Sequence, residues 1–432
     1  LAMPSWETGR LKSGFGAKAG GLGSVIEELP EELVKAAANV GIDLHIEILT
    51  PCFAHYDRSK LSRDPVRIPV RLDNDRFEIT TYRRDIDSSI SVVYFWDELQ
   101  LGWTNADSLY PSDPEMGFKL YGIISQAISR YIAENNFDSI HSHDYHLGII
   151  PFFLGEEYLS RVPHHLTIHN ATYQGIFPAG SGGPDQLRRI GLDREGLYQK
   201  YFELNGSLNF LRAASLITHE TGGKVTTVSG DLKASWGYAA ELKRSHEEIL
   251  TRARNLKGGK PVGDVFVPNC GLDIFRDIGI IGITNGLSPV NRAENLPELK
   301  ASVLRSQQEK SGGDPIFCNP AVSAALLGRD HNFGPGNLEV KKELKRLLHL
   351  ELFGSEPEAD LVFLVSVGRL ASQKNFELIA ATAERVMGCY PSVKFAIMAN
   401  PPEGDMEARA LQKRFESLKA SYPDSFFYSR VF

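Results

Sequence analysis

KAGGLGSV, residues 18–25, is the stretch that decides the fold, because it stands directly before a predicted amphipathic helix that runs from about residue 25 to residue 38. Its three glycines let the main chain approach an anion closely. The N–H groups and the dipole at the start of a helix favour negative charge, and Lys18 adds a mobile cation. The stretch predicts a turn that binds a diphosphate; a tight turn with a helix cap at Ser24 is the alternative.

A second polar cluster lies at residues 139–146, where a short apolar strand runs directly into the sequence HSHDYH. Open parallel sheets bind their ligands at the carboxyl ends of the strands, so His143 and Asp144 are candidate site residues. The histidine spacing also suggests zinc, but no cysteine lies near and Asp144 interrupts the ligand set. We therefore expect no metal here.

Another strand end follows in the sequence LTIHNATYQG, residues 166–175. Its polar side chains, beginning with His169 and Asn170, suit a hydroxyl-rich ligand. The alternative is that these groups satisfy one another at a buried sheet edge.

The last cluster closes an apolar, β-branched run at residues 364–375, whose sequence is LVSVGRLASQKN. The run predicts a strand that ends at Arg369 and is buried on both faces, as in a parallel sheet. Lys374 lies in the turn that follows. Two cations at the end of a buried strand predict a phosphate ligand; the alternative is that both side chains extend into solvent.

Strand and helix signals alternate along the chain, which is typical of doubly wound parallel sheets. Apolar runs predict strands at residues 44–49, 92–96, 165–169, 225–228, 361–367, 393–398 and 425–428. Apolar residues at helical spacing predict helices at residues 118–135, 376–387 and 407–418. The first sheet is expected to close near Thr284 and the second to begin at Leu361. A length of 432 residues is consistent with two or three domains.

Composition excludes several classes of protein. The content of 42% hydrophobic and 23% charged residues is ordinary for a globular protein. A net charge of −7 without a basic stripe argues against a nucleic-acid partner. Four scattered cysteines suggest a reducing compartment. No apolar run approaches the ~20 residues that span a bilayer, and the N-terminus lacks the apolar core of a signal peptide, so no membrane partner is expected.

The chain resembles the glycogen and starch synthases of the bacterial and plastid type, which are retaining glucosyltransferases of glycosyltransferase family five that use a nucleotide-diphosphate glucose. The family's K-x-G-G-L-G, H-x-H-D-aromatic-H and T-I-H-N-x-x-Y-Q-G signatures match residues 18–23, 141–146 and 167–175. Three further blocks agree in order, at residues 225–229 with 238–241, at 282–287 and at 368–374. The matches cover nearly the whole chain.

The resemblance implies the GT-B architecture, in which two doubly wound parallel-sheet domains face each other across a cleft. It divides the chain into an N-terminal synthase catalytic domain at residues 1–284, a crossover and insertion at 285–360, and a C-terminal nucleotide-sugar-binding domain at 361–432. The family's E-P-C-G-L block, whose glutamate contacts the donor sugar, would lie beyond Phe432. We therefore expect the second domain to be incomplete and this chain alone to be inactive.

The resemblance also implies roles for the strand-end residues. Transfer by front-face attack is favoured, because Asp144 is the only carboxylate in the matched strand-end motifs and no nucleophile is evident. The catalytic residues, which neutralise the leaving diphosphate or hold the glucose, would be Lys18, His169, Arg369 and Lys374. The substrate-binding residues would be Gly20, Gly21, His143, Asp144, Asn170, Tyr173, Gln174, Asn285 and Gly286. No metal or other cofactor is expected.

The implied reaction transfers glucose, with ADP-glucose as the favoured donor, to the non-reducing end of an α-1,4-glucan, in the cytoplasm or the plastid stroma. This chain departs from the family at Ala19, Ser24 and Ser288, and it carries an insertion at residues 292–354. Two alternatives follow. One is a non-catalytic GT-B module that binds nucleotide or glucan, and the other is a related synthase that makes another linkage, such as α-1,3.

Overall fold

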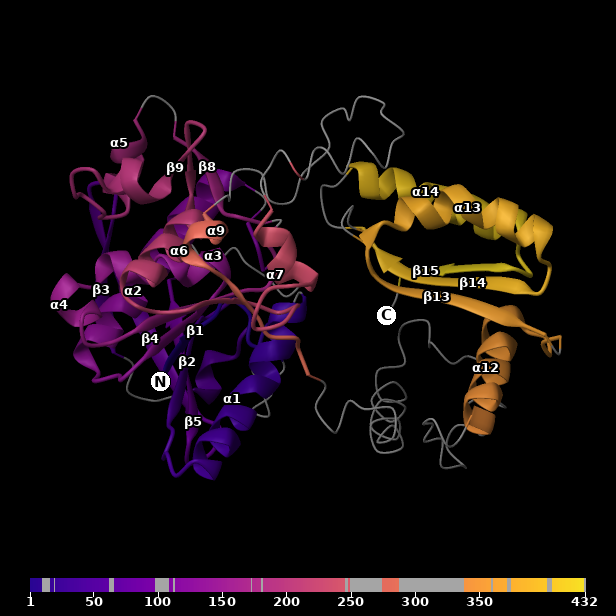
Figure 1. The fold of residues 1–432 in the computed structure, drawn as a ribbon, viewed down its shortest axis with the longest axis horizontal. Coiled ribbons are helices and arrows are strands. Elements are labelled where there is room, and N and C mark those ends of the chain that lie inside the picture. The colour runs from indigo at the N-terminus through magenta and orange to yellow at the C-terminus, as the bar shows by residue number, and fades with distance from the viewer. Residues whose placement is uncertain are drawn as a thin grey trace. The chain divides into compact units, whose positions relative to one another are not determined.

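The computed structural model describes the chain except for residues 10–15, 19, 62–65, 98–108, 112, 172, 180–181, 245–247, 249–273, 287–337, 359, 371–373, 402–405 and 431–432, and the side chains of residues 338–341. The chain divides into two compact units, Leu1–Gly286 (unit 1) and Leu287–Phe432 (unit 2). Figure 1 shows the elements of each unit. No helix in the described part of the chain is long and apolar enough to cross a membrane.

The main sheet of unit 1 has nine strands in the order β12-β11-β7-β6-β1-β2-β5-β4-β3. From β12 to β5 all neighbours pair in parallel, whereas β4 is antiparallel to both β5 and β3. The strands are β1 (Ala2–Pro4), β2 (Ile46–Pro51), β3 (Arg67–Leu72), β4 (Asp75–Asp85), β5 (Ile90–Trp96), β6 (Ile140–His143), β7 (His164–Ile168), β11 (Val225–Thr227) and β12 (Ile281–Gly282). A small antiparallel sheet adds β8 (Ile176–Pro178), β9 (Glu203–Leu204) and β10 (Ser207–Asn209).

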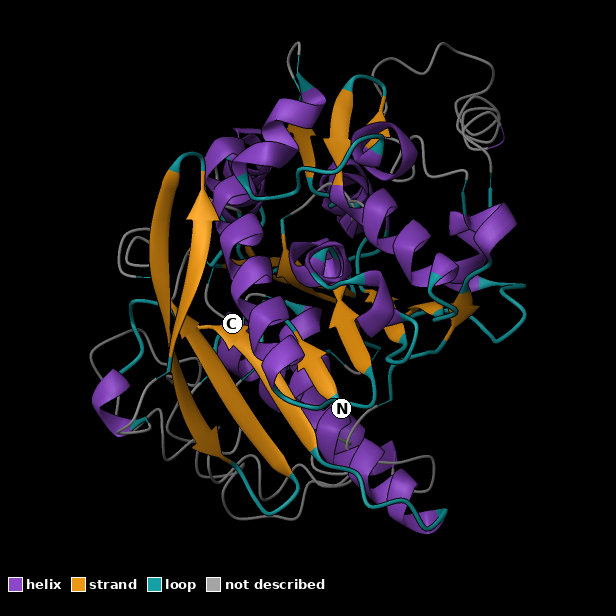
Figure 2. Ribbon diagram, turned by 90° about the vertical axis from the view of Figure 1, so that its left-hand side faces the viewer, coloured by secondary structure: helices purple, strands orange, loops and turns teal. Residues whose placement is uncertain are grey.

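Helices connect most of these strands in the chain, and Figure 2 shows the helices in purple and the strands in orange. The described helices of unit 1 are α1 (Gly21–Asn39), η1 (Arg58–Lys60), α2 (Pro114–Glu134), α3 (Asp144–Gly148), η3 (Ile150–Phe153), α4 (Glu156–Leu159), α5 (Gly183–Arg189), η4 (Tyr198–Phe202), α6 (Phe210–Glu220), α7 (Gly237–Leu242) and α9 (Phe275–Ile278). Helix α2 confirms the predicted helix at residues 118–135. Helix α1 begins four residues before the predicted start, so Ser24 lies inside it and is not its cap.

The strand order reverses at β1. The chain moves from β1 to the neighbouring β2 on one side and returns through β5 to β6 on the other side. Right-handed crossovers then require α1 and α2 to lie on opposite faces of the sheet, and Figure 1 shows the strands between them. The crevice between the carboxyl ends of β1 and β6 is therefore the topological switch point, where open α/β sheets bind ligands.

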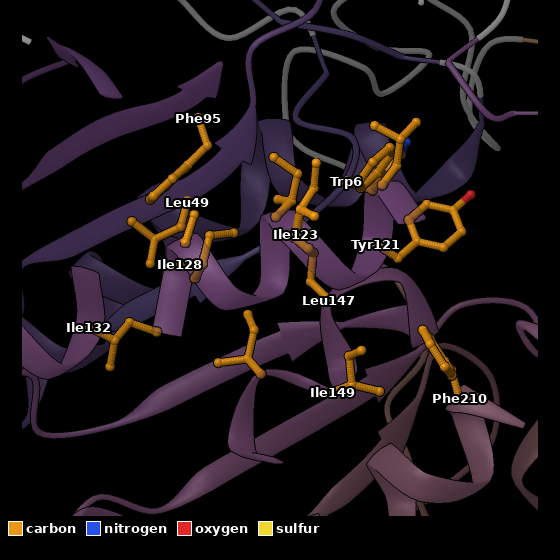
Figure 3. Packing of buried hydrophobic residues seen from close by; sticks show 14 of the residues in the cluster. Trp6, Leu49, Phe95, Tyr121, Ile123, Ile128, Ile132, Leu147, Ile149 and Phe210 are labelled. Atoms are coloured by element: carbon orange, nitrogen blue, oxygen red, sulfur yellow. The ribbon is translucent and has the colours of Figure 1, made fainter. Parts of the chain in front are cut away.

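The core of unit 1 packs around α2, which has buried side chains on most of its circumference. Figure 3 shows Ile123, Ile128 and Ile132 of this helix among the apolar side chains of the sheet. Trp6 meets Tyr121 edge to face, with ring centroids 4.7 Å apart, and its Nε1 donates to the carbonyl of Leu109. This packing anchors the chain immediately after β1, next to the switch point.

Unit 2 contains a parallel sheet in the order β13-β14-β15, made of β13 (Val362–Arg369), β14 (Val393–Asn400) and β15 (Phe426–Ser429). Its described helices are α12 (Leu338–Phe353), α13 (Phe376–Cys389) and α14 (Met406–Ser421). The predicted strands and helices of this part are confirmed within a few residues. Helices α13 and α14 lie together over the sheet (Figure 1).

The prediction that β13 is buried on both faces is wrong for the described residues. Val365 and Val367 are 49% and 58% exposed. Strand β13 is an edge strand of the described sheet, and α13 and α14 pack mainly on β14 and β15. The apolar run predicts the strand correctly, but it does not predict whether other elements pack on one face of the strand or on both.

Candidate active site

The candidate site of unit 1 lies where four parallel strands end. Glu7 follows β1, Asp144 follows β6, His169 follows β7 and Asn285 follows β12. Because these strands are parallel, their carboxyl ends meet at one edge of the sheet. Glu7 and Asp144 therefore lie on the two sides of the switch point.

The glycine-rich turn forms the N-terminus of α1. Gly20 is the N-cap residue, and no side chain of its own caps the helix. The N–H groups of Gly20 and Gly23 instead donate to Oε2 of Glu7, over 2.9 and 3.3 Å. Lys18 is partly exposed, with Nζ 3.7 Å from Oε2 of Glu27. Binding of a diphosphate by Lys18, Gly20 and Gly21 stays a prediction.

Asp144 is the buried carboxylate at the end of β6. Its φ of 59° is left-handed, which aspartate tolerates better than most residues. Oδ1 accepts hydrogen bonds from the N–H groups of His169, at 2.7 Å, and Asn170, at 3.4 Å. Burial raises the pKa of Asp144 to about 7, although these two hydrogen bonds oppose the shift. Asp144 thus holds the backbone at the end of β7 in place. Its carboxyl group is only partly ionised near neutral pH.

The histidines of these strand ends form an uncharged group, in which His143 and His146 are buried and His141 and His169 are partly exposed. His143 Nδ1 lies 2.9 Å from His169 Nε2, and His141 Nε2 lies 2.7 Å from Thr167 Oγ1. Burial lowers the pKa of His141 to about 4 and that of His143 well below its ordinary value. Within the described residues, Nε2 of His143 and Nδ1 of His146 have no hydrogen-bond partner. Uncharged imidazoles of this kind can exchange hydrogen bonds with sugar hydroxyls.

The polar residues at positions 170–174 of the signature mostly make hydrogen bonds within the protein. Gln174 is buried, its Nε2 donates to the carbonyl of Ala171, and its Oε1 accepts from Asn209. Asn170 accepts from the hydroxyl of Tyr238 through Oδ1, at 3.3 Å. Tyr173 is 47% exposed at the same edge of the sheet. The amide of Gln174 is thus engaged within the protein, whereas the Tyr173 ring can reach a ligand.

The remaining predicted residues lie at chain boundaries or in unit 2. Asn285 and Gly286 are exposed directly after β12, at the end of unit 1. Arg369 ends β13 beside Asn400 of β14, and Lys374 stands two residues before α13. Neither cation makes an ion pair with any residue that the structure describes. Ser288 and Ala19, where the chain departs from the synthase signatures, lie outside the described residues, as does most of the 292–354 insertion.

Glu7 is the site residue that the sequence reasoning missed. A single acidic residue thirteen positions before a glycine gives no local signal. The three-residue strand β1 that positions it is also too short to recognise from periodicity. The described residues contain no group of three or more histidine, cysteine or acidic side chains suited to a metal ion.

Two parallel α/β units, the first with polar side chains at its switch point and the second with cations at a strand end, are consistent with a glycosyltransferase of the GT-B type. The family model for the starch synthase catalytic domain matches residues 2–249, and the chain belongs to this family. Starch synthase IV from Arabidopsis thaliana shares the fold, with a TM-score of 0.64 at 18% identity, over all of this chain and 74% of that one.

Two bacterial glycogen synthases align with most of the chain. The glycogen synthase of Kosmotoga olearia is 23% identical over 415 residues, covering 94% of this chain and 69% of the relative. The glycogen synthase of Desulforudis audaxviator is 28% identical over 427 residues, covering 94% and 68%. The chain thus spans about two thirds of the length of these relatives.

Replacing Asp144 by asparagine is expected to stabilise unit 1 at alkaline pH. The folded state raises the pKa of Asp144, so its contribution to stability is greatest at low pH and is lost as pH rises from about 4 to 7. The introduced asparagine would keep the Oδ1 acceptor and tolerate the left-handed backbone without ionising. Urea unfolding at pH 8 should show Asp144→Asn to be more stable by about 2 to 4 kcal/mol.

The pH dependence separates this effect from a general change in packing. At pH 4.5 the two proteins should differ by much less, because wild-type Asp144 is then protonated in the folded state. A wild type that is more stable than the variant at pH 8 would contradict the interpretation.

Proposed function

We propose that this protein transfers glucose from ADP-glucose to the non-reducing end of an α-1,4-glucan with retention of configuration. The observation that carries the proposal is the group of Asp144, His143, His169 and Asn170 at the switch point of unit 1, inside the region that matches the starch synthase catalytic domain. The related starch synthase IV was solved bound to ADP and acarbose, which supports a nucleotide and a sugar chain as the two ligands.

The geometry favours front-face attack over a covalent intermediate. Asp144 uses Oδ1 for two backbone N–H groups and is only partly ionised near neutral pH, so it is a poor nucleophile. In the proposed mechanism the departing diphosphate takes the proton of the acceptor hydroxyl. Catalysis then depends on stabilising the charge that develops on the diphosphate.

Each group has a proposed role in that step. Arg369 and Lys374 of unit 2 bind the diphosphate, and Lys18 with the Gly21 N–H adds stabilisation from unit 1. His169 and Asn170 hold the glucose hydroxyls. Side-chain cations and backbone N–H groups supply the needed positive charge, so the proposal includes no metal ion or other cofactor.

Glucan elongation tests the proposal directly. This chain and any longer protein that contains it are each incubated with ADP-glucose or UDP-glucose and a glycogen primer, and the linkage of the product is read from its anomeric NMR signals. Because this chain alone is expected to be inactive, the proposal expects incorporation by the longer protein, with ADP-glucose preferred and only α-1,4 linkages. New α-1,3 signals would favour the related synthase. Calorimetric binding of ADP or glucan without transfer, in this chain and in any longer protein that contains it, would favour the non-catalytic module.

In a longer protein that contains this chain, Lys18→Ala is expected to lower kcat/KM for transfer by on the order of 10², because it removes a cation from the diphosphate. Its ion pair with Glu27 is partly exposed, so stability should change little. Lys35→Ala is the matched control, since Lys35 lies within α1 and pairs with Glu32 on the helix surface. A loss below threefold for Lys18→Ala would show that Lys18 is an ordinary surface lysine.

A further inference from the structure

Glu7 is an almost completely buried acidic residue, 3% exposed, that enters the switch point from the end of β1. Its two carboxylate oxygens have different partners. Oε2 accepts from the N–H groups of Gly20 and Gly23, and Oε1 accepts from the hydroxyl of Tyr110. Glu7 therefore connects three segments that are distant in sequence: the chain after β1, the glycine-rich turn and the segment before α2.

Helix α1 needs such a partner, because it begins without a local cap. Its N-cap is Gly20, which has no side chain, and its first turn contains no acidic residue. The first N–H groups of a helix have no acceptor within the helix and are normally satisfied by a nearby Ser, Thr, Asp or Asn. Glu7 supplies this acceptor from thirteen residues away and places a negative charge at the positive end of the helix dipole.

Two glycines are needed for the close approach of Glu7. A Cβ on Gly23 would lie 2.9 Å from Oε2 of Glu7 and 3.0 Å from Cγ of Lys18. Gly9 has a φ of 69°, and a Cβ there would lie 2.4 Å from the carbonyl oxygen of Gly23. These positions are thus explained by packing between the Glu7 segment and the first turn of α1.

Gly21 is different. It is exposed, and a Cβ added there would meet nothing within 4 Å. Glu7 bonds to the residues on both sides of it, Gly20 and Gly23, and so holds the turn by its ends while the surface at Gly21 remains open.

We propose that Glu7 is a positioning residue, a remote cap that holds the glycine-rich turn so that the Gly21 N–H faces the donor diphosphate. This inference rests on the proposed function, because it assumes a diphosphate ligand. Glu7 acts through the turn and does not touch the donor. The length of its side chain is therefore what matters, since it sets the position of Oε2 relative to Gly20 and Gly23.

If the negative charge of Glu7 acted directly on the ligand, the effect on nucleotide binding would be opposite. A second anion beside the diphosphate would weaken nucleotide binding by repulsion, so removing the charge would tighten it. The two roles are separated by two variants. Glu7→Gln keeps the length and an acceptor oxygen but removes the charge, whereas Glu7→Asp keeps the charge but withdraws the oxygens by one methylene.

Two measurements are made on both variants. The first is the dissociation constant of ADP by calorimetry. The second is the hydrogen-exchange rate of the amides at residues 20–23 in nucleotide-free protein, by mass spectrometry. Glu32→Gln and Glu32→Asp are the matched controls, because Glu32 is an exposed acid of the same helix that pairs with Lys35. Circular dichroism confirms that each variant is folded.

The positioning role expects Glu7→Asp to weaken ADP binding at least tenfold and to speed amide exchange at residues 20–23 at least tenfold. Glu7→Gln and both Glu32 variants should stay within about fivefold of wild type in both measurements. Wild-type behaviour of Glu7→Asp would overturn the inference, and tighter ADP binding by Glu7→Gln would show that the charge opposes the phosphate instead. A wild type that binds no ADP would count against the proposed function, while the exchange rates would still decide whether Glu7 holds the turn.

Discussion

Unit 1 is expected to lose about 3 to 4 kcal/mol of stability between pH 7 and pH 5, because it buries uncharged histidines. His143, His146 and His164 are at most 4% exposed. Burial lowers the pKa of His146 and His164 to about 3 and that of His143 well below its ordinary value. As the pH falls below 6.5, the unfolded chain takes up protons that the folded chain cannot, so stability falls with pH.

The size of the effect follows from the same linkage. Each of the three histidines costs about 1.4 kcal/mol per pH unit below its unfolded pKa. Asp144 acts in the opposite direction, since its raised pKa stabilises the folded state as pH falls from 7 to about 4. The histidines prevail, and the net loss over the whole interval from pH 7 to pH 5 is about 3 to 4 kcal/mol, against a total stability on the order of 5 to 15 kcal/mol. We therefore expect the unfolding temperature to fall by about 10 °C between pH 7 and pH 5.

Tryptophan fluorescence can follow unit 1 selectively, because all four tryptophans of the chain lie within residues 1–286. His164 offers a matched variant. Its Nε2 lies 2.9 Å from Ser142 Oγ and its Nδ1 lies 2.7 Å from Thr218 Oγ1, and the Thr218 hydroxyl donates to the carbonyl of Ala214. The Thr218 oxygen must then accept a hydrogen bond from the Nδ1–H group of His164, and an asparagine amide can replace that donor.

His164→Asn should therefore reduce the net dependence of stability on pH by about half, because it removes one of three histidines whose effect Asp144 partly offsets, even if the variant is less stable at pH 7. An unchanged slope, or a wild type equally stable at pH 7 and pH 5, would show that the buried histidines do not govern acid stability.

The sequence predicted those parts of the site that are encoded by adjacent residues. The H-x-H-D and T-I-H-N motifs mark the ends of two short strands, and parallel pairing brings both strand ends to one edge, so Asp144 and His169 were expected there. Glu7 could not be found in this way. Its contacts depend on tertiary packing between β1 and α1, which no local pattern reports.

For the fold as well, some elements could be predicted from the sequence and others could not. Strand β5 was predicted from its apolar run and helix α2 from apolar residues at helical spacing, and the GT-B class followed from the resemblance of the motifs. The β3–β4 hairpin was missed, although Ile68, Val70 and Leu72 alternate with exposed residues in the pattern of a half-buried antiparallel strand. The burial of β13 was wrongly predicted because an apolar run gives the strand but not the elements that cover it.

Arg369 and Lys374 are expected to act as a pair on the leaving diphosphate. Replacing both should therefore weaken nucleotide binding by less than the sum of the two single replacements. Both belong to the carboxyl-end side of the unit 2 sheet: Arg369 ends β13, and Lys374 precedes α13. Among the described residues neither has an ionic partner, so each is available for an anion. Each change to alanine should cost about 1.5 to 3 kcal/mol of ADP binding, as expected for a charge-assisted hydrogen bond.

The double variant distinguishes a shared phosphate from two independent surface charges. Once one cation is absent, the diphosphate is more hydrated and the second cation contributes less, so the double variant should lose clearly less than the two single losses combined. Calorimetric titration of ADP and UDP against wild type, both single variants and the double variant measures this coupling. Arg385→Ala, an exposed arginine further along α13, is the control and should bind as wild type. Additive small losses would contradict the pairing, and unchanged affinity in all variants would favour a GT-B module without transfer activity.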